Sequence, residues 1–267
     1  MPPFERVEIE GVRVAYRQQG IGRDIICLHA IGHGGGDFDG IVAPLARQCR
    51  VTVIDWPNHG WSDDDTRAPS VGRYAHVLAL LLTALDLRRV VVIGNSIGGG
   101  AAIQYTQSNP ENVRALVLAN PAGLVTPSRR TKTATRAMQR FFAAGVARRW
   151  WFDAAFKGYY RLVLPKAGTQ ARRRAIIAAR YEMAPTLEQA WSSFAEPASD
   201  LRAVAAALEC PVLVTWAMRD RFVRYSLCRE ALEMIPLCTI EKFERRPLPL
   251  PRERRWLSNL RRAVPSQ

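Results

Sequence analysis

A serine lies at the centre of segment 94–98, whose sequence is Gly-Asn-Ser-Ile-Gly. The four β-branched residues 90–93 before it predict a strand buried on both faces, and residues 101–105 after it predict the start of a helix. A serine on a sharp turn between strand and helix exposes its hydroxyl as a nucleophile, and Gly94 and Gly98 let the two elements approach closely. We therefore expect Ser96 to be a nucleophile, the alternative being an incidental serine in a glycine-rich turn.

Strand-like and helix-like segments alternate around this serine. A hairpin is predicted over 7–16, buried strands over 25–29, 51–55, 90–93, 113–119, 211–216 and 239–243, and helices over 37–48, 70–86 and 226–235. This alternation predicts an α/β fold with a mostly parallel central sheet flanked by helices. Residues 125–199 are helical, rich in Arg and aromatic residues, and contain no strand-like run, which indicates an inserted helical lid. The expected organisation is core 1–124, lid 125–199, core 200–244, and an Arg- and Pro-rich tail 245–267.

Composition narrows the class of protein. A length of 267 residues with 48% hydrophobic content suits one α/β domain with an insertion. No apolar run reaches 18 residues and the first residues lack the apolar core of a signal peptide, so neither a membrane span nor secretion is expected. Five scattered cysteines predict buried free thiols in a reducing compartment, and hence a cytoplasmic location. We expect no metal and no cofactor.

The net charge of +14 raises the question of a nucleic-acid partner. The charge is local, because residues 126–182 carry a net +12 and residues 245–267 a net +6, which leaves −4 on the rest of the chain. Neither segment contains a nucleic-acid-binding motif. A solvent-exposed, Arg-rich helix face is therefore the expected explanation, and we expect neither nucleic acid nor a membrane as partner.

Four segments together carry a resemblance to a known family. They are residues 29–32 (His-Ala-Ile-Gly), residues 55–62 (Asp-Trp-Pro-Asn-His-Gly-Trp-Ser), residues 94–98, and the strand that ends at Asp220. In this order, and from residue 5 to about residue 243, the chain resembles the α/β-hydrolase fold superfamily in its lid-bearing branch of serine hydrolases and esterases.

The resemblance implies a role for each matching residue. Ser96 is the nucleophile, Asp220 is the acid of the catalytic triad, and the backbone N–H groups of Ile97 and Ile31 form the oxyanion hole. The family usually has His-Gly where this chain has His-Ala at 29–30. Asn120 occupies the alternative position of the acid and cannot ionise. The aromatic residues at 150–160 of the lid imply a small-molecule substrate with an apolar or aromatic acyl group.

The resemblance also implies a catalytic histidine after the last strand, and none is found there. No histidine follows residue 76, and the chain after residue 243 turns abruptly to Arg, Pro and Leu. Three explanations stay open: a reading-frame error near codon 245, a protein that truly lacks this histidine, or a substitute base among His29, His33 and His59. A general base contributes roughly 10²–10⁴ to the rate.

The expected function is therefore a hydrolase that cleaves a carboxylic ester or related carbonyl substrate through Ser96, impaired as written. An alternative is a carbon–carbon bond hydrolase acting on ring-fission products of aromatic compounds. A further alternative, from another class, is a catalytically silent ligand-binding protein on the same fold. The sequence leaves the substrate, the oligomeric state and the pathway open.

Overall fold

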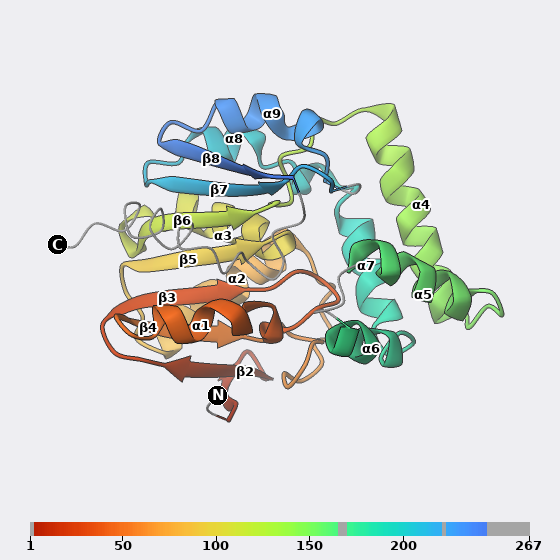
Figure 1. Ribbon diagram of the computed structural model, residues 1–267, viewed down its shortest axis with the longest axis horizontal. Coiled ribbons are helices and arrows are strands. Elements are labelled where there is room, and N and C mark those ends of the chain that lie inside the picture. Colours follow the sequence, from red (N-terminus) through yellow and green to blue (C-terminus); the bar gives the residue numbers. More distant parts are fainter. Residues whose placement is uncertain (1–2, 165–169, 221–222, 245–267) are drawn as a thin grey trace.

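A central sheet forms the core of the protein in a computed structural model, which describes residues 3–164, 170–220 and 223–244. Eight strands lie in the order β1-β2-β4-β3-β5-β6-β7-β8 (Figure 1). The pairs β1–β2 and β2–β4 are antiparallel, and the remaining five pairs are parallel. The strands are β1 Glu5–Ile9, β2 Val12–Gln19, β3 Arg23–Leu28, β4 Cys49–Ile54, β5 Val90–Asn95, β6 Val113–Ala119, β7 Val212–Ala217 and β8 Cys238–Phe243. The prediction of a mostly parallel α/β sheet is confirmed.

Helices bury both faces of this sheet. Because side chains alternate along a strand, Val90 and Val92 enter one apolar cluster while Val91 and Ile93 enter the other. The first cluster is covered by α2, α3, α8 and α9, and the second by α1. Burial on both faces explains why β5 is a continuous apolar run. These helices are α1 Asp39–Leu45, α2 Val71–Ala84, α3 Ile97–Ser108, α8 Arg202–Ala206 and α9 Tyr225–Glu233.

Four further helices interrupt the core between β6 and β7. They are α4 Arg129–Val146, α5 Phe152–Val163, α6 Gln170–Ala178 and α7 Ala184–Ser193, and we call residues 125–199 the insertion. Figure 1 shows these helices beyond the carboxyl ends of the strands. The two ends of the insertion meet, because the N–H of Leu201 donates to the carbonyl of Gly123 over 2.8 Å. Among the described helices, none is both long and apolar enough to cross a bilayer.

The aromatic side chains of the insertion divide into two groups. Phe142, Phe152, Phe156 and Tyr160 are buried in an apolar cluster that holds the four helices together. Trp150 instead is 91% exposed, on the turn between α4 and α5. The sequence predicted that the aromatic residues of segment 150–160 contact an apolar substrate. Those that are buried in the cluster pack against the helices of the insertion instead.

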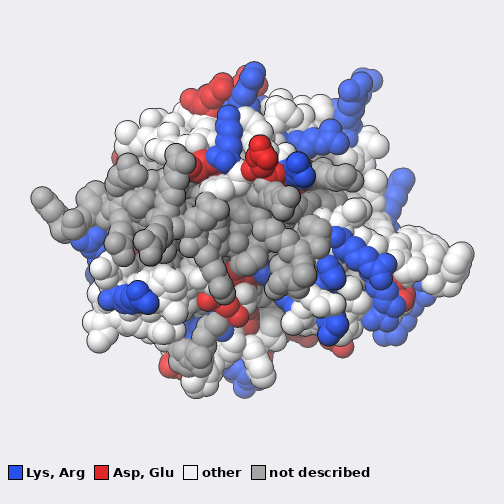
Figure 2. Space-filling model, in the orientation of Figure 1, with Lys and Arg blue, Asp and Glu red and all other residues white. Residues whose placement is uncertain are grey.

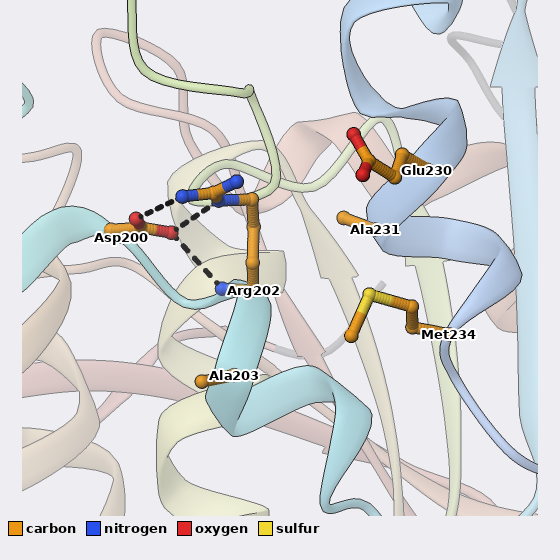
Figure 3. Close-up of a pocket in the computed structure, with 6 residues that line it drawn as sticks. All are labelled: Asp200, Arg202, Ala203, Glu230, Ala231 and Met234. Atoms are coloured by element: carbon orange, nitrogen blue, oxygen red, sulfur yellow. Dashed lines mark hydrogen bonds and ion pairs between the residues drawn. The ribbon is translucent and has the colours of Figure 1, made fainter.

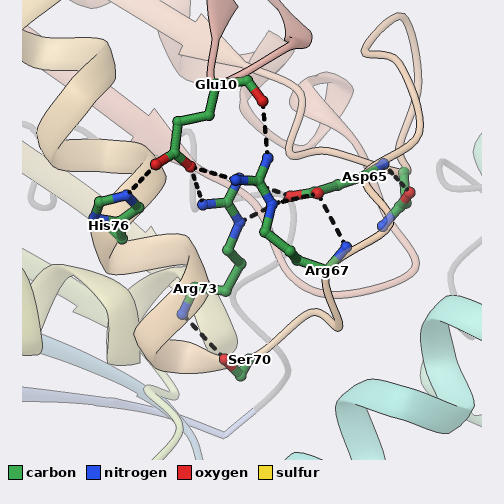
Figure 4. Close-up of polar contacts among 7 residues, drawn as sticks. Glu10, Asp65, Arg67, Ser70, Arg73 and His76 are labelled. Atoms are coloured by element: carbon green, nitrogen blue, oxygen red, sulfur yellow. Dashed lines mark hydrogen bonds and ion pairs between the residues drawn. The ribbon is translucent and has the colours of Figure 1, made fainter.

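A network of charged side chains ties the β1–β2 turn to helix α2 (Figure 4). Glu10 accepts hydrogen bonds from Arg67 and Arg73, each over 2.6 Å, and contacts His76 over 2.9 Å. Asp65 accepts from the same two arginines, each over 2.8 Å. The hydrogen bonds of His76 and Arg73 lower the pKa of Glu10 to about 2. The network fixes the hairpin at the sheet edge against the core.

The five cysteines carry free thiols, as predicted. Cys27 and Cys228 are buried, whereas the other three are only partly buried, which corrects the expectation of burial for all. The predicted tail 245–267 lies outside the described residues.

Candidate active site

Ser96 lies on a sharp turn between β5 and α3, in a conformation that few residues other than glycine adopt. Its φ is 52° and its ψ is −116°, and such a backbone costs of the order of 1–3 kcal/mol. Three hydrogen bonds hold it: its N–H donates to Ala119, and its carbonyl accepts from Gly100 and Ala122, over 2.9–3.0 Å. Ser96 is partly exposed while both of its neighbours are buried. The expected strained turn is therefore present.

Two glycines allow this turn to form. A Cβ atom on Gly94 would lie 2.6 Å from the carbonyl oxygen of Gly98, and a Cβ atom on Gly98 would collide with the carbonyl oxygen of Leu28. The sterics therefore require glycine at both positions. The close contact between Gly98 and Leu28 also brings the first turn of α3 against the end of β3. The loop that follows β3 thus begins beside Ser96.

The two backbone N–H groups predicted for the oxyanion hole lie on these adjoining segments. Ile97 is the first residue of α3, so its N–H has no acceptor within the helix. Ile31 is in the loop after β3, and within the described residues its N–H donates to no acceptor. The side chain of Ile31 packs against both the core and the aromatic cluster of the insertion. This packing fixes the loop between the two parts of the protein.

His59 and His29 hold the loops after β3 and β4 together. Nε2 of His59 accepts the N–H of Gly32 over 2.9 Å, and its Nδ1 lies 2.9 Å from the carbonyl of Pro57. Nε2 of His29 likewise accepts the N–H of Trp56 over 2.9 Å, and its Nδ1 lies 2.8 Å from its neighbouring carbonyl at residue 30. Each ring is therefore neutral, with Nδ1 as donor and Nε2 as acceptor.

Burial keeps both of these rings neutral. It lowers the pKa of His29 to about 3, and it lowers the pKa of His59 to about 3 with a further contribution from the neighbouring His29. Since both nitrogens of each ring are occupied by backbone groups, neither histidine offers a lone pair for a proton from Ser96. His29 and His59 are structural residues, which removes two of the three candidates for a substitute base.

A buried carboxylate lies beneath the turn and was not predicted from the sequence. Asp37 is 1% exposed and forms an ion pair with Arg172 of α6. Its Oδ2 also lies 3.0 Å from Nδ1 of His33 and accepts from Nδ2 of Asn95 over 3.3 Å. Arg172 contacts Nδ1 of His33 over 2.7 Å as well. Because Asn95 directly precedes Ser96, this cluster links the insertion to the turn.

Asp220 follows β7, as predicted, and contacts the neighbouring strand end. Its Oδ2 accepts from Nδ2 of Asn120 over 3.2 Å, and its Oδ1 accepts from the N–H of Val223 over 3.0 Å. Asn120 is the residue after Ala119, whose carbonyl binds the N–H of Ser96. Asp220 and Ser96 are therefore connected at this sheet edge through two hydrogen bonds, one to Asn120 and one to Ala119, which are consecutive residues.

A cavity of about 290 Å³ lies elsewhere, between α8 and α9 (Figure 3). Arg202 projects over it and is held by Asp200 through hydrogen bonds of 2.8 and 2.9 Å. Its other lining residues are Ala203, Glu230, Ala231 and Met234. None of the residues predicted to take part in chemistry lines this cavity.

Comparison with known proteins now decides the family. Residues 25–231 match a family model described as the alpha/beta hydrolase fold, which covers the turn, both adjoining loops and Asp220. The chain belongs to the α/β-hydrolase fold family. The α/β-hydrolase neighbours of known structure include an esterase from Exiguobacterium antarcticum, with a TM-score of 0.82 over 100% of both chains and 19% identity. At this identity the likeness concerns the fold.

Two proteins that are similar to this α/β-hydrolase in sequence carry the names of specific hydrolases. A pimeloyl-[acyl-carrier protein] methyl ester esterase of Chromobacterium violaceum is 29% identical over 84% of this chain and 86% of its own length. A 2-hydroxy-6-oxononadienedioate/2-hydroxy-6-oxononatrienedioate hydrolase of Cupriavidus pinatubonensis is 36% identical over 40% of this chain and 39% of its own length. The chain spans only about a third of the length of the first curated relatives that it matches, 36% in each case.

Proposed function

We propose that this α/β-hydrolase cleaves a carboxylic ester or related carbonyl compound with Ser96 as nucleophile. The observation that carries the proposal is the strained backbone of Ser96, with φ at 52°, beside the loop of Ile31. A strained conformation held by three backbone hydrogen bonds is typical of functional positions. The first residue of α3 and the loop after β3 both adjoin the turn, and each carries a backbone N–H group for the oxyanion.

The reaction follows from these groups. Oγ of Ser96 attacks the carbonyl carbon, and the electron pair of the C=O bond moves to the oxygen. The N–H groups of Ile31 and Ile97 donate to this oxyanion, and removing one such donor typically costs about 10²–10³ in rate. When the intermediate collapses, the C=O bond re-forms and the bond to the alkoxy oxygen breaks; this oxygen takes up the proton removed from Ser96 and departs as the alcohol, which leaves an acyl-enzyme at Ser96. Water then hydrolyses the acyl-enzyme by the same route.

The proton-transfer step of this reaction lacks an identified base. Oγ of Ser96 must lose its proton, and in the family a histidine held by an acid such as Asp220 accepts it. The sequence contains no histidine after His76. Since His29 and His59 are committed to backbone groups, His33 is the loop histidine to test as a base, by replacement with Gln. Without the coupled base the rate falls by up to about 10⁶, leaving roughly 10³–10⁴ over the reaction in water.

The segment where the family places its histidine, from residue 245 onward, lies outside the described residues. A reading-frame error near codon 245 and a chain that truly lacks the histidine both account for the sequence. Independent sequencing of the 3′ end distinguishes them, since an unchanged reading frame eliminates the error.

The substrate class rests on the surroundings of the loop after β3. Tyr160 and Leu187 of the insertion lie against Gly32, where the hydroxyl of Tyr160 is 2.9 Å and a methyl of Leu187 is 2.8 Å from the position of a Cβ atom. Ile31 extends this apolar wall. The apolar character of these side chains favours an apolar or aromatic acyl group, and one relative is named as a methyl ester esterase.

Two measurements test the proposal together. A fluorophosphonate should label the protein at Ser96, and hydrolysis of an activated aryl ester should depend on the same residue. Ser96→Ala should abolish both, while Ser108→Ala, at the other end of α3, should leave both unchanged. Labelling that persists in Ser96→Ala contradicts the assignment. If the wild-type chain takes no label even when imidazole is added as a base, the ligand-binding alternative replaces the enzymatic one.

A carbon–carbon bond hydrolase is the second candidate function, favoured by the name of the Cupriavidus relative. Such a reaction uses the same oxyanion donors at an attacked ketone. Loss of the visible absorbance of a ring-fission dienoate, present in the wild type and absent in Ser96→Ala, supports this candidate. Turnover of aryl esters without any turnover of the dienoate favours the esterase.

A further inference from the structure

Helix α4 carries a stripe of basic side chains that face solvent. Arg129, Lys132, Arg136 and Arg140 are spaced by three, four and four residues, so they share one face of the helix. All four are exposed. Within the described part of the chain, none of them lies within 4 Å of a carboxylate, because the ion pairs of the insertion involve other residues. We call these four residues the basic stripe.

The turn that follows α4 exposes large apolar side chains. Trp150 is 91% exposed, Val146 50% and Trp151 37%. Arg148 and Arg149 lie between them in the sequence and are exposed as well. Figure 1 shows that this turn lies on the side of the insertion away from the sheet, and Figure 2 shows Lys and Arg gathered over the same side of the molecule. A group of exposed apolar side chains beside arginines that form no ion pair within the described residues is typical of an interaction surface.

We propose that the basic stripe and the turn with Trp150 form a docking surface for an anionic lipid bilayer. Unpaired basic residues complement anionic headgroups, and each contributes about 1 kcal/mol near such a surface, which is about fivefold in the partition coefficient. The amphipathic ring of tryptophan is suited to the boundary between headgroups and acyl chains. A nucleic acid as partner would account for the basic stripe through its phosphate groups. It gives no reason for the exposed apolar side chains in the turn after α4.

This surface lies on a bilayer and does not span it. The sequence-based expectation of no membrane partner rested on the absence of an apolar span, which concerns a different mode of binding. The proposal also goes beyond the proposed hydrolase activity, because it uses no residue of the candidate active site. Ser96→Ala should therefore bind vesicles as the wild type does, so the two proposals fail independently.

Co-sedimentation with vesicles tests the docking surface. The wild type should bind vesicles that contain phosphatidylglycerol and should bind pure phosphatidylcholine at least tenfold more weakly. The double variant Arg136→Gln/Arg140→Gln should bind the anionic vesicles about 30-fold more weakly than the wild type. The double variant Arg47→Gln/Arg88→Gln removes the same charge from exposed positions outside the insertion, and it should bind within a few-fold of the wild type.

The apolar contribution has its own matched pair. Trp150→Ala should weaken binding severalfold, whereas Ile21→Ala, which removes a side chain that is 90% exposed on the β2–β3 connection, should not. Equal binding to neutral and anionic vesicles overturns the proposal, as does wild-type affinity in the stripe variant. Binding of duplex DNA that depends on the stripe, without binding to vesicles, replaces the lipid surface by a nucleic-acid surface.

Discussion

Acid should destabilise this protein well before its carboxylates are protonated, because His29 and His59 are buried as neutral rings. The side chains are 0% and 2% exposed, and the pKa of each is lowered to about 3. In the unfolded chain the pKa of histidine is about 6.5. Between these values the unfolded state binds more protons, so the free energy of unfolding falls as the pH falls. The two neutral rings contribute their full share to the free energy of unfolding above about pH 6.5, and this share is lost progressively as the pH falls toward about pH 3.

The size of the effect follows from the same two values. A pH of about 5 is about 1.5 units below the pKa of histidine in the unfolded chain, so the unfolded ring is protonated while the buried ring stays neutral. This difference lowers the free energy of unfolding by about 2 kcal/mol for each histidine. The two together remove about 4 kcal/mol, against a typical total of 5–15 kcal/mol for a domain. Urea denaturation at about pH 7.5 and about pH 5, followed by circular dichroism, measures this difference directly.

Replacing one ring isolates its share. His59→Gln should reduce the pH-dependent loss by about 2 kcal/mol, even though the variant is less stable at both pH values. His76→Gln removes a half-exposed histidine on α2 and is the matched control, which should keep most of the loss. An unchanged difference between the two pH values in His59→Gln would refute the assignment of this ring as a buried neutral group.

Three further predictions concern the candidate site. Gly98→Ala should lower the free energy of unfolding by about 1–3 kcal/mol and abolish labelling at Ser96, because the new Cβ atom collides with the backbone of Leu28. Gly36→Ala is the control: its Cβ atom meets nothing closer than 3.8 Å, so stability and labelling should not change. Added imidazole should accelerate ester hydrolysis by the wild type and not by Ser96→Ala, since it supplies the missing base; no acceleration above the Ser96→Ala background argues against a site that lacks only its base. Arg172→Gln leaves Asp37 buried without its ion-pair partner and should lower the urea midpoint by the equivalent of about 3–5 kcal/mol; a midpoint like that of the wild type is the contrary result.

The fold and the turn at Ser96 could be predicted because their signals are local. Val90 to Ile93 read as a buried strand from four consecutive side chains, and the glycines that permit the turn lie within two residues of the serine. The start of α2 carries a local signal of the same kind, since the hydroxyl of Ser70 caps this helix by accepting from the N–H of Arg73 over 3.0 Å. Each of these patterns carries its physical reason within one turn or one strand.

The cluster beneath the turn could not be predicted in this way. Asp37, Asn95 and Arg172 come from three distant parts of the chain, and only the tertiary fold brings them together. The roles of His29 and His59 were hidden for a related reason. A histidine in a loop at this edge of the sheet has the same residue type whether it accepts a substrate proton or a backbone N–H, and only the partner of Nε2 distinguishes the two.

The hydrogen bond between Gly123 and Leu201 limits how strongly the length of the insertion can affect the sheet. The insertion leaves and re-enters the core at two residues that touch each other. A segment whose ends meet in this way can differ in length without changing the order of the strands, provided that the contacts of Arg172 with Asp37 and of the insertion with Ile31 are kept. The surface charge and the length of the insertion can therefore vary along the segment 125–199 while the strand order that positions Ser96 stays constant.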